Sequence, residues 1–417
     1  MIRRALDHPL IPVEYRHNFI HLYQDIAWFG VLNGSALAFL AVYATRLGAS
    51  GFQIGLLSAM PALVNLVFAI PSGQWLQRGA ISKAVFWTSV FNRLGYLLWI
   101  PLPWLFNEKE QVWALIALAL LMAIPGTALA VGFNTLFAEA VPAEWRAHVA
   151  GIRNAVLAIT YMLATLGCGY LLDHLPFPSG YQVVFGIGFL GAAMSSYHLL
   201  RVRSLACQDA PPSPESRKTG GRRSSGHATA ASLSGSNIWR TPFRKVLLVL
   251  FGFHLAQYLA IPIFPIFYVR GIGLSDDQIG IGMAIFYFTV LLGSTQLARL
   301  TRRLDHRRVT GLGAVLMSIY PVLLSLSRGF GLYLLTSALG GFAWAMVSGA
   351  LANYLLERVP PDERPRYLAW YNIVLNASIL IGCLSGPLMA DWLGLSVALV
   401  TFGVLRLLAG LAILRWG

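Results

Sequence analysis

The sequence predicts an all-α membrane protein with twelve transmembrane helices, arranged as two six-helix bundles related by pseudo-symmetry. Three observations carry this prediction: the composition, the spacing of the apolar runs and an internal repeat. Hydrophobic residues make up 57% of the 417 residues and charged residues only 12%, whereas a soluble chain carries about 25% charged residues. Side chains this apolar need lipid around them. A soluble enzyme, a disordered chain and a disulfide-rich secreted domain are therefore excluded.

The apolar runs have transmembrane length. They cover residues 19–45, 53–76, 84–106, 112–138, 148–172, 181–200, 244–269, 277–298, 309–327, 331–356, 367–390 and 395–415. The first run is longer than the apolar core of a signal peptide, so we expect an uncleaved first helix. A Pro-, Gly- and Ser-rich basic stretch follows the sixth run and predicts a flexible linker. The expected domains are an N-terminal bundle (1–202), the linker (203–239) and a C-terminal bundle (240–417).

The basic residues predict the orientation. The net charge is +14, and twelve alternating spans place 25 Lys and Arg residues on the side of the termini and 4 on the other side. Basic residues favour cytoplasmic loops, so we expect both termini in the cytoplasm and the protein in an inner or plasma membrane. Loop charge accounts for the excess without a nucleic-acid partner.

An internal repeat relates the two halves. Residues 48–55 (GASGFQIG) and 273–280 (GLSDDQIG) share five of eight positions at an offset of 225. A second pair of motifs recurs at an offset of 218: Glu139 to Arg146 and Glu357 to Arg364, with Asn154 and Asp173 matched by Asn372 and Asp391. Because six spans separate the copies, they have the same orientation in the membrane, and the pseudo-two-fold axis runs along the membrane normal.

Two six-helix halves, termini on one side and a basic central linker resemble the major facilitator superfamily. The loop after the second span also resembles the signature of that family: Gly73, then Gln77, Arg78 and Gly79, then Lys83. Gln77 stands where the family has an acid, which affects the charge relay of the loop and not the fold. The second-half copy, residues 293–308, is looser. The resemblance implies secondary transport by rocking of the two halves around a central cavity lined by the first, fourth, seventh and tenth helices.

Asp25 is the first candidate functional residue. It lies within the first span and shares a helix face with His21 and Asn33. Ionisable groups inside the membrane are costly and usually functional. Two interpretations stay open: Asp25 couples transport to protons or binds a cation, or it forms a structural ion pair with Arg93 at a similar depth in the third span. Arg406 in the last span has no obvious acidic partner, and backbone carbonyls or snorkelling would each explain it.

The resemblance places further side chains around the cavity. These are Asn134 with Thr127 in the fourth span, His254, Gln257 and Tyr258 in the seventh, and Trp344 and Ser348 in the tenth. A mostly apolar and aromatic set favours neutral or lipophilic solutes, or weakly cationic ones near Asp25, and suits multiply anionic substrates poorly. Structural packing is an alternative for each of these residues, and for His254 in particular.

The repeated loop motifs are candidate gates. Glu139 with Arg146, and Glu357 with Arg364, lie at helix ends on the side of the termini. Salt bridges among them would close the cytoplasmic side in one state of a transport cycle. The alternative is local capping of the helix ends.

The functional prediction is a secondary active transporter of a small organic solute, with export favoured over uptake and proton coupling as one option. The alternative is a membrane assembly factor, or a pigment- or cofactor-delivery factor, that keeps this fold without its own transport cycle. No Walker A, HExxH or GxSxG motif is present, and three cysteines show no metal spacing. We therefore expect no enzyme activity, cofactor or metal, and a functional monomer in the lipid bilayer with a small-molecule substrate.

Overall fold

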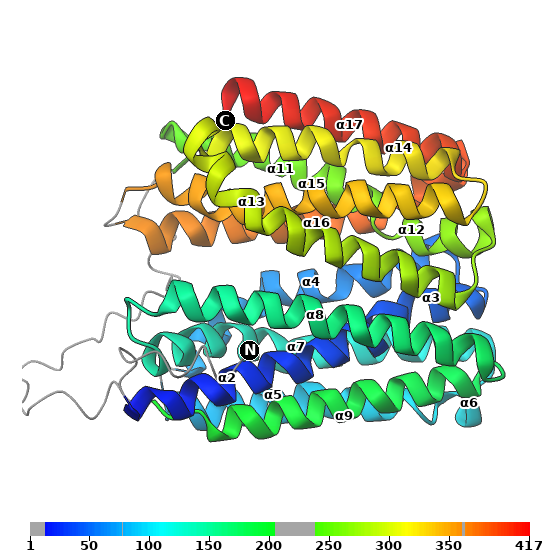
Figure 1. The fold of residues 1–417 in the computed structure, drawn as a ribbon, viewed down its shortest axis with the longest axis horizontal. Coiled ribbons are helices and arrows are strands. Elements are labelled where there is room, and N and C mark those ends of the chain that lie inside the picture. The colour runs from blue at the N-terminus through cyan, green and yellow to red at the C-terminus, as the bar shows by residue number, and fades with distance from the viewer. Residues whose placement is uncertain (1–12, 77, 205–237, 361–362) are drawn as a thin grey trace, which may run out of the picture.

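The structure is a computed structural model that describes residues 13–76, 78–204, 238–360 and 363–417 (Figure 1). These residues form helices and turns and no strand. Ten helical stretches are long and apolar enough to span a membrane. One of them, Asp276–Leu326, contains two spans, and α5 (Ile81–Trp99) packs between two others, α7 and α9. The described part of the chain therefore confirms the predicted twelve-helix membrane fold.

The first six spans follow the predicted order. The first is α2 (Val13–Leu32), continued by the π-helical η1 (Asn33–Leu37) and α3 (Ala38–Arg46). The others are α4 (Gly51–Leu76), α5, α7 (Glu108–Ala140), α8 (Arg146–His174) and α9 (Ser179–Arg201). The third span ends at Trp99 and not at residue 106, because Pro101 has no backbone N–H with which to continue the helix. The chain forms the short α6 (Leu102–Leu105) there.

The last six spans contain two departures from the prediction. After η3 (Ile238–Arg240) come α11 (Phe243–Ala260), α12 (Ile263–Ile266), η4 (Phe267–Ile272), α13 (Asp276–Met317), α14 (Ile319–Leu326), α15 (Phe330–Glu357), α16 (Arg364–Leu393) and α17 (Leu395–Trp416). The seventh span is interrupted at Pro262. The eighth and ninth spans meet at Asp305, whose φ of 65° and ψ of 163° break the helix. Arg299, Arg302 and Arg303 thus lie in helix, not in the loop where they were expected.

The two sets of six helices form two bundles that lie side by side (Figure 1). The helix α2 begins and α17 ends at the same end of the molecule, which we call the terminal end; the opposite end is the far end. One apolar core joins the bundles, including Phe39 and Ile54 of the first with Ile279 and Tyr333 of the second. Three other cores belong to one bundle each.

The repeated sequences adopt the same local structure, which explains the residues they share. Gly48 and Gly273 have φ of 85° and 76°, a region that glycine enters without steric cost. Two residues later, Ser50 and Ser275 begin the next helices. Each serine hydroxyl accepts from a backbone N–H three residues on, and the glutamine there accepts from the serine N–H. These reciprocal bonds satisfy donors that a helix start leaves open.

Candidate functional site

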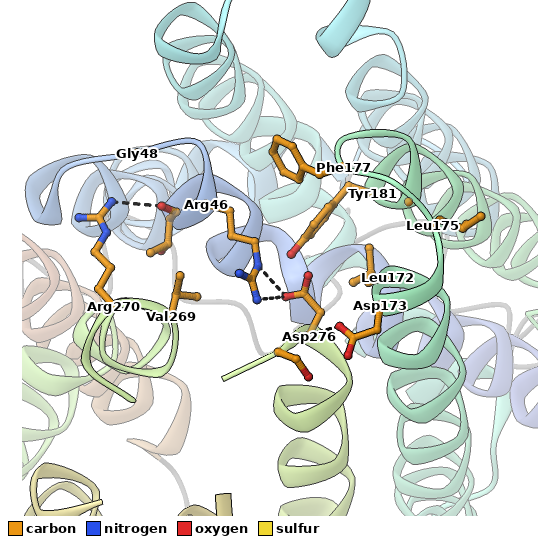
Figure 2. A pocket seen from close by; sticks show the side chains of 13 residues that line it. Arg46, Gly48, Leu172, Asp173, Leu175, Phe177, Tyr181, Val269, Arg270 and Asp276 are labelled. Atoms are coloured by element: carbon orange, nitrogen blue, oxygen red, sulfur yellow. Dashed lines mark hydrogen bonds and ion pairs between the residues drawn. The ribbon is translucent and has the colours of Figure 1, made fainter. Parts of the chain in front are cut away.

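A polar seal joins the two bundles at the far end. Arg46, at the end of α3, donates from Nε to Oδ1 of Asp276 at 2.9 Å, and its Nη2 forms an ion pair with the same oxygen at 2.8 Å (Figure 2). The Asp276 side chain is 8% exposed and that of Arg46 27%. In the reverse direction, Arg270 of the second bundle donates to the carbonyl oxygens of Thr45 (3.1 Å) and Ala49 (2.7 Å). Each bundle thus contributes one arginine to the other.

The helix start at Asp276 is held by a second carboxylate. Asp173, near the end of α8, accepts from the backbone N–H of Asp276 (3.1 Å) and of Asp277 (3.3 Å). A carboxylate at a helix N-terminus is favoured by the helix dipole. Helices also approach closely here, since a Cβ on Gly169 would lie 3.0 Å from the carbonyl oxygen of Asp276. These contacts border a cavity of about 880 Å³ at the far end (Figure 2).

The residues of the seal lie at positions that the repeat relates, but the two copies do not carry the same charges. Asp276 occupies the repeat position of Gly51, and Asp391 that of Asp173. Asp391 lies beside the start of α4, with Oδ1 3.7 Å from the Cβ position of Gly51. The sequence prediction had not assigned a role to Arg46 or Asp276. The one signal available was an acid in one repeat where the other has glycine.

A cavity of about 420 Å³ lies between the bundles, lined by α4 and α7 on one side and α16 on the other. Two of the predicted residues, Gly73 and Asn134, line it. Its polar groups are amides: Asn65 accepts from Thr127 (2.6 Å) and donates to Asn376 (3.3 Å) across the interface. We call it the amide cavity. It offers hydrogen bonds and no charged side chain among its lining residues.

A second cavity, of about 440 Å³, lies within the last six helices and reaches the interface at Tyr161 of α8. Tyr161 stacks on Tyr287 of α13 with ring centroids 3.9 Å apart. The predicted residues Gln257, Tyr258 and Trp344 line it. We call it the aromatic cavity. Its lining also includes Arg406, for which the sequence suggested no role.

Asp25 lines neither of these cavities. It is 3% exposed, and its Oδ2 accepts from Nη1 and Nη2 of Arg153, both at 3.2 Å. Its Oδ1 accepts from Ser195 at 2.5 Å and lies 4.0 Å from Arg93. The expected partner Arg93 is thus the more distant of two arginines. Arg153, to which the sequence prediction gave no role, lies two turns inside α8 and is 7% exposed, because α8 packs directly on α2.

This geometry favours the structural interpretation of Asp25. The carboxylate already has three donors, and a charge paired and hydrogen-bonded in this way is stabilised in its buried site. A coupling role stays a prediction, and Asp25→Asn tests it.

Four other predicted residues lie outside the two cavities. The Nδ1 atoms of His21 and His198 lie 2.9 Å apart. Asn33 donates to its own helix at Phe29, and His254 bonds Tyr371 at 3.0 Å. Ser348 is exposed. Each except Ser348 therefore has a local partner that accounts for its polar group.

At the terminal end, the predicted gate residues make contacts within their own bundle. Arg146 donates to the carbonyl oxygens of Ala138 (2.6 Å) and Val141 (3.1 Å), so it caps α7, and Glu139 accepts from Ser204 at 2.5 Å. Glu357 pairs with His306 at 2.6 Å.

No ion pair joins the two bundles at this end within the described residues. Arg78 and Arg364 are exposed, and Gln77 and Asp362 lie outside the described part. In this conformation the predicted gate residues make local contacts, as the capping alternative expects. Gating stays a prediction for a conformation in which the terminal end is closed. No group of three His, Cys, Asp or Glu side chains is placed to hold a metal ion anywhere in residues 13–76, 78–204, 238–360 and 363–417.

The family model of the Major Facilitator Superfamily matches residues 26–254 and 246–417. The chain belongs to this superfamily. It is therefore a multi-pass membrane protein of a superfamily of secondary transporters.

The relatives are distant. The quinolone resistance protein NorA of Staphylococcus aureus is 21% identical over 133 residues, which is 32% of this chain and 34% of NorA. The match thus spans about a third of NorA. An uncharacterized MFS-type transporter of Methanocaldococcus jannaschii is 21% identical over 363 residues, 86% of this chain and 87% of that protein.

Solved structures show the same fold. The nucleoside transporter NupG has a TM-score of 0.64 at 14% identity, covering 97% of this chain and 99% of that one. A bacterial homologue of the iron transporter ferroportin has a TM-score of 0.69 at 12% identity, covering 97% and 98%. At this level of identity the likeness concerns the fold alone.

Proposed function

We propose that this transporter exports a small organic solute by alternating access, with the terminal end in the cytoplasm. One observation carries the proposal: the polar seal joins the bundles at the far end, whereas the terminal end has no such ion pair between them in the described residues. The amide cavity has walls from both bundles and extends to Gly73 and Pro365, next to the terminal ends of α4 and α16. A solute there would be separated from the far side by the seal.

Two further observations support the direction and the orientation. The quinolone resistance protein NorA is similar over part of the chain, and export of a drug is one way in which a membrane protein can confer resistance. The described loops and helix ends at the terminal end carry many more Lys and Arg residues than those at the far end, which has Arg46, Lys109, Arg270 and Arg328. This asymmetry favours a cytoplasmic terminal end.

The return half of the cycle requires the seal to open and the terminal end to close. We infer that the loops at Glu139–Arg146 and Glu357–Arg364 supply that closure. They are repeat-related and lie at the terminal ends of α7 and α15. In the present conformation Arg146 and Glu357 use partners within their own bundle, and these exposed contacts cost little to exchange. Both cavity walls come from one chain, so we expect a monomer to suffice.

Metabolite profiling of cells and medium tests the proposal. Cells expressing the natural protein are compared with cells expressing Asp276→Arg, in which Arg46 faces a like charge and the seal cannot form. Immunoblotting of membranes matches the expression levels. We expect at least one compound to fall in the cells and rise in the medium only with the natural protein.

Two results would contradict it. Accumulation of the compound inside the cells would refute export and leave transport standing. An unchanged metabolite profile, with a co-purifying protein partner, would favour the assembly-factor alternative.

A further inference from the structure

The aromatic cavity contains a buried positive charge without a negative partner. Arg406 of α17 is 1% exposed and lines the cavity. None of the lining residues is Asp or Glu, and Arg406 forms no ion pair with the described residues. A guanidinium inside the membrane is costly unless it is paired or hydrogen-bonded. The question is therefore what satisfies it.

Backbone carbonyls satisfy part of it. Arg406 donates from Nη2 to Gln257 (2.8 Å), from Nε to Ala256 (3.3 Å) and, more weakly, from Nη1 to Met317 (3.5 Å). The Met317 carbonyl is open because Pro321, four residues on, has no N–H. These bonds fix the orientation of the side chain. They use three of the five N–H groups of a guanidinium and leave its unit charge without a counter-ion.

A second polar group at the cavity also lacks a partner. The Gln257 side chain lines the cavity, is 8% exposed, and its Oε1 has no hydrogen-bond partner in the structure. Gln257 belongs to the same turn of α11 whose carbonyls hold Arg406. The guanidinium and this amide thus line the same cavity. A half-turn of the amide about the terminal side-chain bond exchanges its oxygen and nitrogen, so Gln257 can turn an N–H group toward an acceptor that the guanidinium also binds.

The remaining wall is suited to a flat apolar body. Phe264, Tyr258, Tyr287 and Trp344 line the cavity, and the Phe264 ring centroid lies 5.6 Å from the Arg406 guanidinium carbon. Aromatic walls favour stacking with an aromatic ligand. The volume of about 440 Å³ lies within the range of small-molecule sites.

We propose that the aromatic cavity binds a monoanion with an aromatic body, such as an aryl carboxylate, with its carboxylate on Arg406 and Gln257. This inference rests on the proposed transport function and assigns a substrate class to a second cavity, distinct from the amide cavity. An arginine fork matches a carboxylate geometrically and electrostatically. One unpaired charge accommodates one negative charge, which disfavours phosphorylated or multiply anionic compounds. Arg406 thus gives the aromatic cavity a positive charge, whereas a substrate site at Asp25 would have had a negative charge.

Equilibrium binding to the purified full-length protein in nanodiscs tests the inference. The probes are 2-naphthoate, the neutral 2-naphthamide and the cationic 2-naphthylmethylamine, followed by isothermal titration calorimetry. We expect 2-naphthoate to bind at least tenfold more tightly than the other two. Arg406→Gln should remove this preference, and Arg406→Lys should keep part of it because the charge remains. Equal or tighter binding of 2-naphthamide to the natural protein would overturn the inference whatever the variants do.

A matched control separates this site from general effects of buried arginine. Arg93 is 4% exposed in the first bundle and does not line the aromatic cavity. Arg93→Gln should therefore retain the preference for 2-naphthoate, and its loss in this variant would contradict the assignment to Arg406. If Arg406→Gln does not fold, Gln257→Met keeps the charge and should weaken 2-naphthoate binding about threefold or more while leaving 2-naphthamide closer to its natural affinity.

The outcomes for binding and for transport are distinguishable. Tight binding of 2-naphthoate without movement of any compound across the membrane would refute the transport proposal and leave the site. Export of a neutral or cationic compound, without a preference for 2-naphthoate, would refute the site and leave transport.

Discussion

Neutralising Asp276 should open the far end. In the present conformation Nε and Nη2 of Arg46 lie 2.9 and 2.8 Å from one carboxylate oxygen of Asp276, and the acid is 8% exposed. Asp276→Asn keeps the shape and removes the charge. The substitution weakens the conformation that is closed at the far end and does not weaken the one in which the bundles separate at that end. It therefore shifts the equilibrium toward the open conformation.

The size of the shift follows from the burial of the pair. Fully exposed ion pairs contribute about 0–1 kcal/mol, and breaking a fully buried pair costs about 3–5 kcal/mol. Asp276 is buried and Arg46 is 27% exposed, so we expect a loss of about 2 kcal/mol between these ranges. Since 1.36 kcal/mol corresponds to tenfold, the population open at the far end should rise about 30-fold.

The native thiol of Cys383 measures this population. Cys383 is 1% exposed, and its backbone carbonyl lies against Gly55 of the other bundle. Replacing Cys168 and Cys207 by Ala leaves it as the only thiol. If the far end opens and closes faster than the thiol reacts, the rate of labelling by N-ethylmaleimide is proportional to the open population. The rate should therefore rise about 30-fold in Asp276→Asn.

The repeat supplies the control. Asp391 is the counterpart of Asp173 at the same end, is exposed, and has no ion pair with the described residues. Asp391→Asn should change the labelling rate less than twofold. The reasoning is refuted if both variants accelerate labelling equally, or if Asp276→Asn leaves it unchanged. The exchanged pair Arg46→Asp with Asp276→Arg should restore slow labelling if charge attraction is the cause.

Three further predictions concern packing and buried charge. Gly55→Val places a side chain against the opposite helix, where even a Cβ would collide with a carbonyl oxygen. The variant should therefore stay open at the far end and lose transport, which the flux of the exported compound measures. Arg153→Ala should lower the free energy of unfolding by about 3–5 kcal/mol, because the Asp25 carboxylate then lacks its closest cation. Arg93→Ala should lower it less, as measured by chemical denaturation. Equal losses in the two variants would argue against this ranking. Ser275→Ala removes a helix cap, and the melting temperature should fall by an amount equivalent to about 1 kcal/mol, whereas no change would mean that tertiary contacts alone hold this helix start.

The repeat shows how far sequence reasoning reached into the structure. The sequence showed that residues 48–55 and 273–280 are related and lie between predicted spans. The structure adds that both copies form the same helix cap, at Ser50 with Gln53 and at Ser275 with Gln278. Such features are local, because each depends on residues within a few positions of one another. Where local chemistry was overlooked, as at Pro101, the predicted boundary of the third span was wrong by several residues.

The sequence by itself determined that this protein is a membrane transporter fold of twelve helices, because apolar length, loop charge and an even-numbered repeat are properties of the chain order. Only the tertiary structure decided which charges meet. Asp25 and Arg153 are 128 residues apart and Arg46 and Asp276 are 230 apart. Their contacts depend on how each helix is rotated and which neighbour it packs against, and the spanning segments are apolar on most of their surface. A periodic pattern that is apolar all round does not specify that rotation. For the same reason, Arg406 could be recognised as unusual from the sequence, and its place in an aromatic cavity could not.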